Sequence, residues 1–337
     1  MRIRNYIFAL LAAGVLVLPG CKKDDDDDTP SIYGTIQFDE LPAYVLKGDS
    51  FHITATGAYR GSDKTDTLVG YYMYNSMTAL RDTIRKENQS GVAEGDFVVD
   101  KDTTGTFTFS IYAFAKGYYG NSASCTFTVV NPVFNAPGSS ITGHPFEIGV
   151  TSILNDARDG RLYYASSTAS GAWMLNNLAW NGAGVPFADA DAMSYISGRF
   201  YSWEEATAAC PVGWKLPSDA DFVALAGAGS AGETIPGKAG MLKGDVCFNG
   251  TAMWPFTDIS VTITNESMFT AMPWGYMTTS AGIHSFKSVR NMAAFWTADS
   301  VDADNARVRY VLSDSNDIFV QAMDKKSFGA SVRCIKE

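Results

Sequence analysis

Hydrophobic and polar residues alternate along much of the stretch 32–131. In Phe51–Ala55, in Phe107–Ile111 and again in Thr126–Val129, every second residue is apolar and its neighbours are mostly polar. A period of two places the apolar side chains on one face of a β-strand. Glycines separate these stretches, as turns between strands require. Several short alternating strands within about 100 residues predict a β-sandwich.

Two short helices are predicted in the second half of the chain. Ser202 and Glu205 have the spacing of a capping box, and Pro211 would end the helix that they begin. Ser218 is the expected N-cap of the next helix, which Gly227 would end. Since apolar residues recur at helical spacing inside both segments, each helix is expected to bury one face.

Alternation returns near the end of the chain. In the stretch 306–312 the apolar residues are expected to face inward, and Arg307 and Arg309 are expected to face the solvent. Ile318 and Val320 belong to the next predicted strand. The second half therefore combines helices and strands.

The first twenty residues have the pattern of a secretory signal. Arg2 and Arg4 precede the apolar run Ile7–Leu18, which is too short for a helix that crosses a bilayer. The run ends in Leu18–Cys21, which resembles the lipobox of bacterial lipoproteins. That resemblance implies acylation of Cys21 and attachment to a membrane through an N-terminal lipid. The alternative is an ordinary signal peptide with an incidental cysteine.

Five consecutive aspartates, Asp24–Asp28, follow this cysteine. A block of like charges stays solvated and predicts a tether without fixed structure. An acidic tether after a lipidated cysteine also resembles the surface-export signal of Bacteroidetes lipoproteins, which implies a place on the outer face of the outer membrane. A simple spacer is the alternative.

The chain is acidic overall. Its formal net charge is −10. Removal of residues 1–20 with Arg2 and Arg4 leaves −12, of which residues 21–28 carry −3, so the body carries −9. An acidic body argues against nucleic acid as a partner. The expected segments are a signal (1–20), a tether (21–31), a first domain (32–131), a hinge (132–149) and a second domain (150–337).

The second domain carries a set of ordered motifs. Trp203–Cys210, Gly213–Asp219, Phe295–Thr297 and Ser331–Ile335 resemble blocks of the Fibrobacter succinogenes major paralogous domain, and the resemblance covers about residues 150–337. That domain looks like a C-type-lectin-like fold, in which an early helix is tied to the final strand.

This resemblance implies a disulfide between Cys210 and Cys334. Cys125 and Cys247 would then be free and buried. In the first domain, Gly105–Phe109 resembles the closing strands of bacterial immunoglobulin-like modules. The expected fold class is therefore α+β, with an N-terminal immunoglobulin-like β-sandwich followed by a C-type-lectin-like α+β domain.

Candidate binding residues lie in segments broken by glycine and proline. Trp254, Trp274 and Tyr276 would stack on sugars or fill partner pockets if they are exposed on loops. Core packing is the alternative, and it is the expectation for Trp173 and Trp296.

Four oxygen-bearing residues fall in one predicted loop: Asp299, Asp302, Asp304 and Asn305. They are the candidate ligands for a calcium ion, and a solvated loop is the alternative. No cofactor is expected otherwise. The sequence shows no nucleophile or phosphate-binding motif.

We therefore expect a non-catalytic recognition or adhesion protein of the cell surface, bound to an extracellular glycan or protein. A structural subunit or tip of a surface fibre or cell-envelope complex is the alternative. An enzyme acting on extracellular polymer is a third reading.

Overall fold

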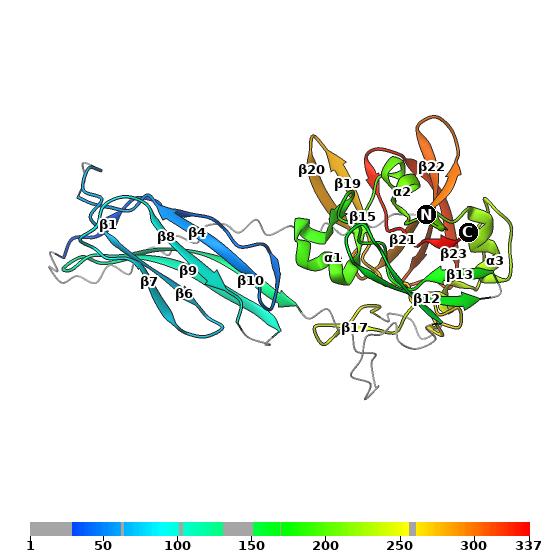
Figure 1. The fold of residues 1–337 in the computed structure, drawn as a ribbon, viewed down its shortest axis with the longest axis horizontal. Coiled ribbons are helices and arrows are strands. Elements are labelled where there is room, and N and C mark those ends of the chain that lie inside the picture. The colour runs from blue at the N-terminus through cyan, green and yellow to red at the C-terminus, as the bar shows by residue number, and fades with distance from the viewer. Residues whose placement is uncertain (1–28, 62–63, 101–103, 131–150, 169, 256–260) are drawn as a thin grey trace.

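The structure of the chain is a computed structural model (Figure 1). It describes residues 29–337 with the exception of 62–63, 101–103, 131–150, 169 and 256–260. The expected signal, Cys21, most of the tether and the expected hinge lie outside the described residues. Within the described ranges, no helix combines the length and the apolar character needed to cross a membrane.

The first region consists of β-strands. Its five-stranded sheet has the order β3-β10-β9-β6-β7, with β3 Tyr44–Leu46, β6 Gly70–Asn75, β7 Arg81–Arg85, β9 Gly105–Phe114 and β10 Asn121–Val130. A three-stranded sheet has the order β2-β4-β8, with β2 Gln37–Phe38, β4 Ser50–Thr56 and β8 Ala93–Val98. The short strands β1 Ile32–Tyr33 and β5 Tyr59–Arg60 pair with each other.

One apolar cluster joins these two sheets. Ile53 of β4 and Phe97 of β8 contribute to it from the smaller sheet, and Phe109 and Phe127 contribute from the larger one. The exposed His52 lies between inward-facing neighbours and contacts Asp96 at 2.9 Å. The predicted alternation is confirmed for these strands. The immunoglobulin-like identity of the expected sandwich stays a prediction.

The second region contains two larger sheets and several small ones. A five-stranded sheet has the order β11-β12-β13-β25-β16, with β11 Ser152–Asn155, β12 Leu162–Thr168, β13 Gly171–Met174, β16 Trp214–Lys215 and β25 Ile335–Lys336. A three-stranded sheet follows chain order, with β21 Met292–Ser300, β22 Asn305–Leu312 and β23 Ile318–Asp324. The final strand β25 therefore lies inside its sheet, between β13 and β16.

The remaining strands form small sheets. β19 Tyr276–Ser280 pairs with β20 Ile283–Lys287 and with β24 Phe328–Gly329. The two-residue strands β14 Val185–Pro186 and β15 Arg199–Phe200 form one pair, and β17 Cys247–Phe248 and β18 Thr251–Ala252 form another.

Three short α-helices occur in the described residues: α1 Asp191–Ser197, α2 Trp203–Ala209 and α3 Asp219–Ala226. Two 3-10 turns accompany them, η1 Phe187–Asp189 and η2 Ala239–Met241. The capping box predicted at Ser202 and Glu205 is confirmed, and Ser218 and Asp221 form a second one. Ser202 Oγ accepts the Glu205 amide at 3.3 Å, and the Glu205 carboxylate accepts the Ser202 amide at 2.8 Å. Gly227 ends α3 in the left-handed conformation.

The expected α+β class is wrong. The three helices have only seven, seven and eight residues, while strands supply most of the regular structure in both regions. The second region is a β-rich fold of curled sheets, and it is not a clear α+β C-type lectin. The physical reason lies in the linking segments. Several segments between the longer elements form strands of only two residues, as in β14-β15 and β17-β18. An alternating pattern cannot be recognised over two residues, so these strands were not predicted.

Arg309 does not face the solvent as predicted. Its side chain is 1% exposed. The sheet β21-β22-β23 is covered on both faces, because Ala306 and Val308 belong to one apolar cluster and Val311 and Ile318 to another. The alternation rule assumes that one face of the sheet is exposed to solvent, and at Arg309 both faces of this sheet are covered.

Cys210 and Cys334 form a disulfide, as the family resemblance implied. The bond joins the end of α2 to the residue before β25, across a sequence separation of 124. Cys125 and Cys247 are free, and each is partly rather than fully buried. Burial raises the pKa of both thiols, so neither is activated as a thiolate at neutral pH.

The two regions touch at helix α1 (Figure 1). Tyr44 and Leu46 of β3 pack against the apolar cluster that holds Met193 and Ile196 of the helix. The ring of Tyr44 also lies 5.8 Å from that of Phe187. Helix α1 is therefore supported from the side of the first region, which leaves its other side to the pocket described next.

Candidate binding pocket beside helix α1

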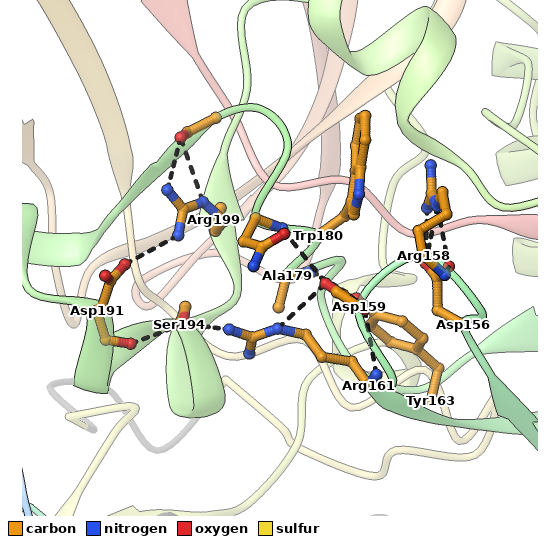
Figure 2. A network of polar contacts seen from close by, with 12 residues as sticks. Asp156, Arg158, Asp159, Arg161, Tyr163, Ala179, Trp180, Asp191, Ser194 and Arg199 are labelled. Carbon is orange, nitrogen blue, oxygen red and sulfur yellow. Dashed lines mark hydrogen bonds and ion pairs between the residues drawn. The ribbon is translucent and has the colours of Figure 1, made fainter.

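A pocket of about 340 Å³ opens between a tight turn and helix α1. Asp159–Tyr164 form one wall, Asn176 and Asn177 lie in a second, and Ser194–Ile196 of the helix form the third. Its volume is in the range of small-molecule sites. Figure 2 shows the polar contacts around it.

The turn that forms the first wall is fixed by Asp156. The Asp156 side chain accepts the Arg158 amide at 3.0 Å and the Arg158 guanidinium at 2.6 Å, and its carbonyl accepts the Gly160 amide at 2.7 Å. Burial raises the pKa of Asp156, but the hydrogen bonds from Arg158 outweigh it and leave that pKa below its ordinary value. Gly160 has a φ of 73°, which favours glycine.

Arg161 crosses from this turn to helix α1 (Figure 2). Its Nη2 donates to Ser194 Oγ at 3.0 Å, and its Nε lies 3.4 Å from Asp159 Oδ2. Ser194 Oγ in turn donates to the Asp191 carbonyl at 2.7 Å. Because the Asp159 carboxylate is nearly buried beside it, the positive charge of Arg161 is already balanced within the wall.

An aromatic ring covers the guanidinium. Arg161 Cζ lies 4.3 Å from the centroid of the Tyr195 ring, and Tyr195 is 56% exposed. This stacking holds the ring at the mouth of the pocket. Asn176 Oδ1 accepts the Tyr164 amide at 2.8 Å, which orients the amide group of the side chain and directs its Nδ2 away from that contact.

The base of the pocket is rigidly supported. Asn177 donates to the Ser197 carbonyl at 2.8 Å and to Ser331 Oγ at 3.2 Å. Tyr163 OH accepts the Ala179 amide at 3.0 Å, and burial raises the pKa of Tyr163 to about 12. These side chains are held by contacts with the core, so they fix the position of the wall.

Arg333 holds Asn177 from behind. Its Nε donates to Asn177 Oδ1 at 2.6 Å, and the rest of the guanidinium donates to the carbonyls of Met174, Phe269 and Thr270. Among the described residues these partners are all uncharged. Burial therefore lowers the pKa of Arg333 to about 9. Arg333 precedes the disulfide cysteine and links the pocket base to the last strand.

A second arginine lies beside the start of helix α1. Arg199 contacts the Asp191 carboxylate at 3.1 Å and donates to the Gly184 carbonyl at 3.0 Å (Figure 2). Asp191 is the first residue of α1, where a carboxylate is favoured by the helix dipole. The contact ties the start of the helix to the strand pair β14-β15.

The arrangement suits an uncharged ligand that is rich in hydroxyl groups. The exposed Tyr195 ring offers an apolar face, while Arg161 and Asn176 offer N–H donors beside it. A bound anion would compete with Asp159 for the guanidinium and would meet a body of negative charge. A cation would be repelled by the positive charge of the Arg161 side chain.

The aromatic residues singled out from the sequence do not line this pocket. Trp254 and Trp274 are 3% and 2% exposed, and both belong to apolar clusters. The Trp254 indole donates to the Ala271 carbonyl at 3.0 Å. Both therefore occupy the core, which was the alternative. Tyr276 is partly exposed on β19 and stacks on Phe328 with 5.0 Å between ring centroids.

Three of the four candidate calcium ligands, Asp299, Asp302 and Asn305, use their side chains in other contacts. Asp299 accepts the Asp219 amide at 2.5 Å. Asp302 accepts the amides of Asp304 and Asn305 at 2.8 and 2.7 Å, which closes a turn. Hydrogen bonds from the Asn305 side chain, and from these amides, lower the pKa of Asp302. In the described part of the chain, no group of three or more His, Cys, Asp or Glu residues is arranged to hold a metal ion.

Sequence reasoning missed the pocket because its walls are distant in the chain. The helix that carries Ser194 and Tyr195 was not predicted. Ala190 occupies its N-cap and makes no side-chain hydrogen bond. The available signal was the apolar spacing of Ala192, Met193 and Ile196, which are buried on one side of α1.

Comparison with known proteins gives the family of the second region. A search of the curated proteins found no match. The model of the Fibrobacter succinogenes major domain matches residues 150–336, more than half of the chain. The match covers α1, the disulfide and the complete pocket, so the pocket belongs to the family domain. The chain is therefore a member of the Fibrobacter succinogenes major domain family.

Proposed function

We propose that this protein is a lipid-anchored recognition protein of the cell surface, and that the pocket beside α1 binds an extracellular glycan without catalysis. The observation that carries the proposal is the exposed Tyr195 ring held over Arg161, at the mouth of a pocket of about 340 Å³. A ring of this kind with adjacent N–H donors matches a sugar, which has one apolar face and a belt of hydroxyl groups.

The charge balance favours a neutral sugar. Arg161 is paired with Asp159 at 3.4 Å and hydrogen-bonded to Ser194 at 3.0 Å, so it can donate further without an unpaired charge. The preorganised wall lowers the cost of ordering side chains on binding. A pocket of this volume takes the terminal unit of a longer chain.

Replacement of Tyr195 by alanine tests the pocket. The ring is 56% exposed, so its removal leaves the core intact. We expect the full chain, purified in detergent, to bind glycans on an array. Tyr195→Ala should lose at least about tenfold in affinity, which is about 1.4 kcal/mol, since aromatic anchors at binding hot spots contribute about 2 kcal/mol or more. Titration calorimetry with the best array glycan measures the loss.

Tyr33→Ala is the matched control, because Tyr33 is a tyrosine of the first region that is 48% exposed. Its affinity should equal that of the unchanged chain. Glycan binding in this pocket would be refuted if the chain bound no glycan on the array, or if the two variants lost affinity equally.

The proposed location of the protein at the membrane depends on Cys21, which follows the short apolar run. We expect the mass of the intact chain from native membranes to begin at Cys21 and to include acyl chains, and Cys21→Ser to release the protein from the membrane fraction. Two or more acyl chains are needed for stable anchoring. A mature chain that begins elsewhere, or a variant that stays in the membrane, would contradict the anchor.

A further inference from the structure

A second hollow of about 190 Å³ lies where β19 and β24 meet the sheet β21-β22-β23. Its floor consists of Ala294 and Val308, which are each 1% exposed, and of the nearly buried Phe328. Tyr276 and Tyr310 rise beside this floor and are partly exposed. The hollow is separate in composition from the α1 pocket, since no residue lines both.

Stacked aromatic pairs fix the two walls. Tyr276 stacks on Phe328 with 5.0 Å between centroids and 21° between planes. Tyr310 stacks on its cross-strand partner Phe319 with 5.1 Å and 17°. Ala294 lies opposite Tyr310 in the β21-β22 register, and its small side chain leaves the space between the walls open.

The polar groups of this hollow are uncharged. They are the phenol hydroxyls of Tyr276 and Tyr310 and the carboxamide of the exposed Gln321. Within the described ranges none of these three groups has a hydrogen-bond partner, and no charged side chain lines the hollow. The remaining lining residues are Met292 and Met323, which are apolar and adaptable.

We infer that this hollow is a second binding site, and that it takes a single uncharged sugar ring. The apolar floor and aromatic walls match the carbon face of a sugar, while two hydroxyls and one amide match its hydroxyl groups. An apolar side chain of a protein partner would cover these three polar groups without pairing them, at about 1–3 kcal/mol for each group left unsatisfied. An ionic ligand would find no charge to balance it.

This inference goes beyond the proposed function, because it does not depend on the pocket beside α1. Two sites on one domain would let a polysaccharide bind twice, and the second contact would form at a high effective concentration. Each site alone then needs only modest affinity.

Saturation-transfer NMR tests the site on the full chain in detergent. The probes are the methyl β-glycosides of glucose, galactose, mannose and N-acetylglucosamine. We expect at least one of them to show transfer from the unchanged chain. In a Tyr195→Ala chain, which lacks the other proposed site, the signal should persist. Ala294→Leu, which fills the hollow, should reduce the signal of that chain at least fivefold.

A second variant covers the case in which Ala294→Leu fails to fold. Tyr310→Phe combined with Gln321→Ala removes two polar groups and keeps the wall, and it should also reduce the signal at least fivefold. Tyr74→Phe is the matched control for loss of a phenol hydroxyl, because Tyr74 lies on β6 of the first region. No transfer to any probe from the unchanged chain, or a signal that both hollow variants retain, overturns the second site. Loss in Tyr195→Ala alone overturns it as well and supports only the α1 pocket.

Discussion

Replacement of Cys210 and Cys334 by alanine is expected to destabilise the second region by about 5 kcal/mol. The bond closes a loop with a sequence separation of 124. In the chain-entropy model, a crosslink of that length removes about 5 kcal/mol of conformational freedom from the unfolded chain. Since whole domains have only about 5–15 kcal/mol of stability, the double variant should unfold at a much lower denaturant concentration.

Tryptophan fluorescence reports this unfolding selectively, because all seven tryptophans lie at or after Trp173. The control is a chain in which the free Cys125 and Cys247 are replaced by alanine. It also loses two sulfur atoms, but no crosslink is broken, and its unfolding midpoint should move by less than half as much. Equal midpoints for the two double variants would contradict the proposed role of the crosslink.

Replacement of Arg309 by methionine is expected to lower the free energy of unfolding by about 3–5 kcal/mol, because it leaves the buried Asp219 carboxylate without its cationic partner. Asp219 is fully buried at the start of α3, and it accepts hydrogen bonds from Arg309 Nε and from the Gly232 amide. Arg309 also donates to the Glu233 carbonyl at 2.7 Å. One guanidinium therefore joins β22, α3 and the segment that follows the helix.

Arg307→Met is the matched control on the same strand. The Arg307 side chain is 35% exposed, and its nearest carboxylates are 3.9 Å away. A partly exposed pair contributes about 1 kcal/mol or less. Chemical denaturation should rank the Arg309 variant far below the Arg307 variant.

Addition of Asp219→Asn to Arg309→Met removes the stranded charge, so the double variant should recover part of the loss. Similar stabilities for the two arginine variants, or a double variant less stable than Arg309→Met, would show that Arg309 acts through packing and not through the buried charge.

The sequence predicted those helices and strands that depend on residues close together in the chain. Ser202 and Glu205 are three residues apart, and their capping box fixes the start of α2 without help from tertiary contacts. The alternation in β4 and β9 likewise identifies the face that carries Ile53 and Phe109. These are short-range regularities, and the structure reproduces them.

The features that depend on distant contacts were not predictable. The alternating pattern predicts that Arg309 faces the solvent. In the fold, α3 packs over that face of the sheet and brings Asp219 into contact with Arg309. The pocket beside α1 combines Arg161 with Tyr195, which are brought together only by the packing of the helix against the turn. Two-residue strands such as β16 and β25 have no period of their own, so the balance of strand and helix could not be judged from pattern alone.

The disulfide was predictable for a different reason. Spacing alone leaves the pairing of four cysteines open, and the family resemblance selected Cys210 and Cys334. The same resemblance suggested the wrong fold class, because it was extended from the motif blocks to the whole architecture. A motif fixes the local contacts of its residues more securely than the arrangement of the segments between them.

The position of β25 has a consequence for biosynthesis. Ile335 pairs with Trp173 on one side and with Lys215 on the other, so residues near the end of the chain complete a sheet that begins at β11. During translation this sheet stays open until Ile335 has left the ribosome. Until then the nascent segment exposes unpaired strand edges. Ribosomes that stall shortly before this point would release polypeptides that quality-control proteases degrade.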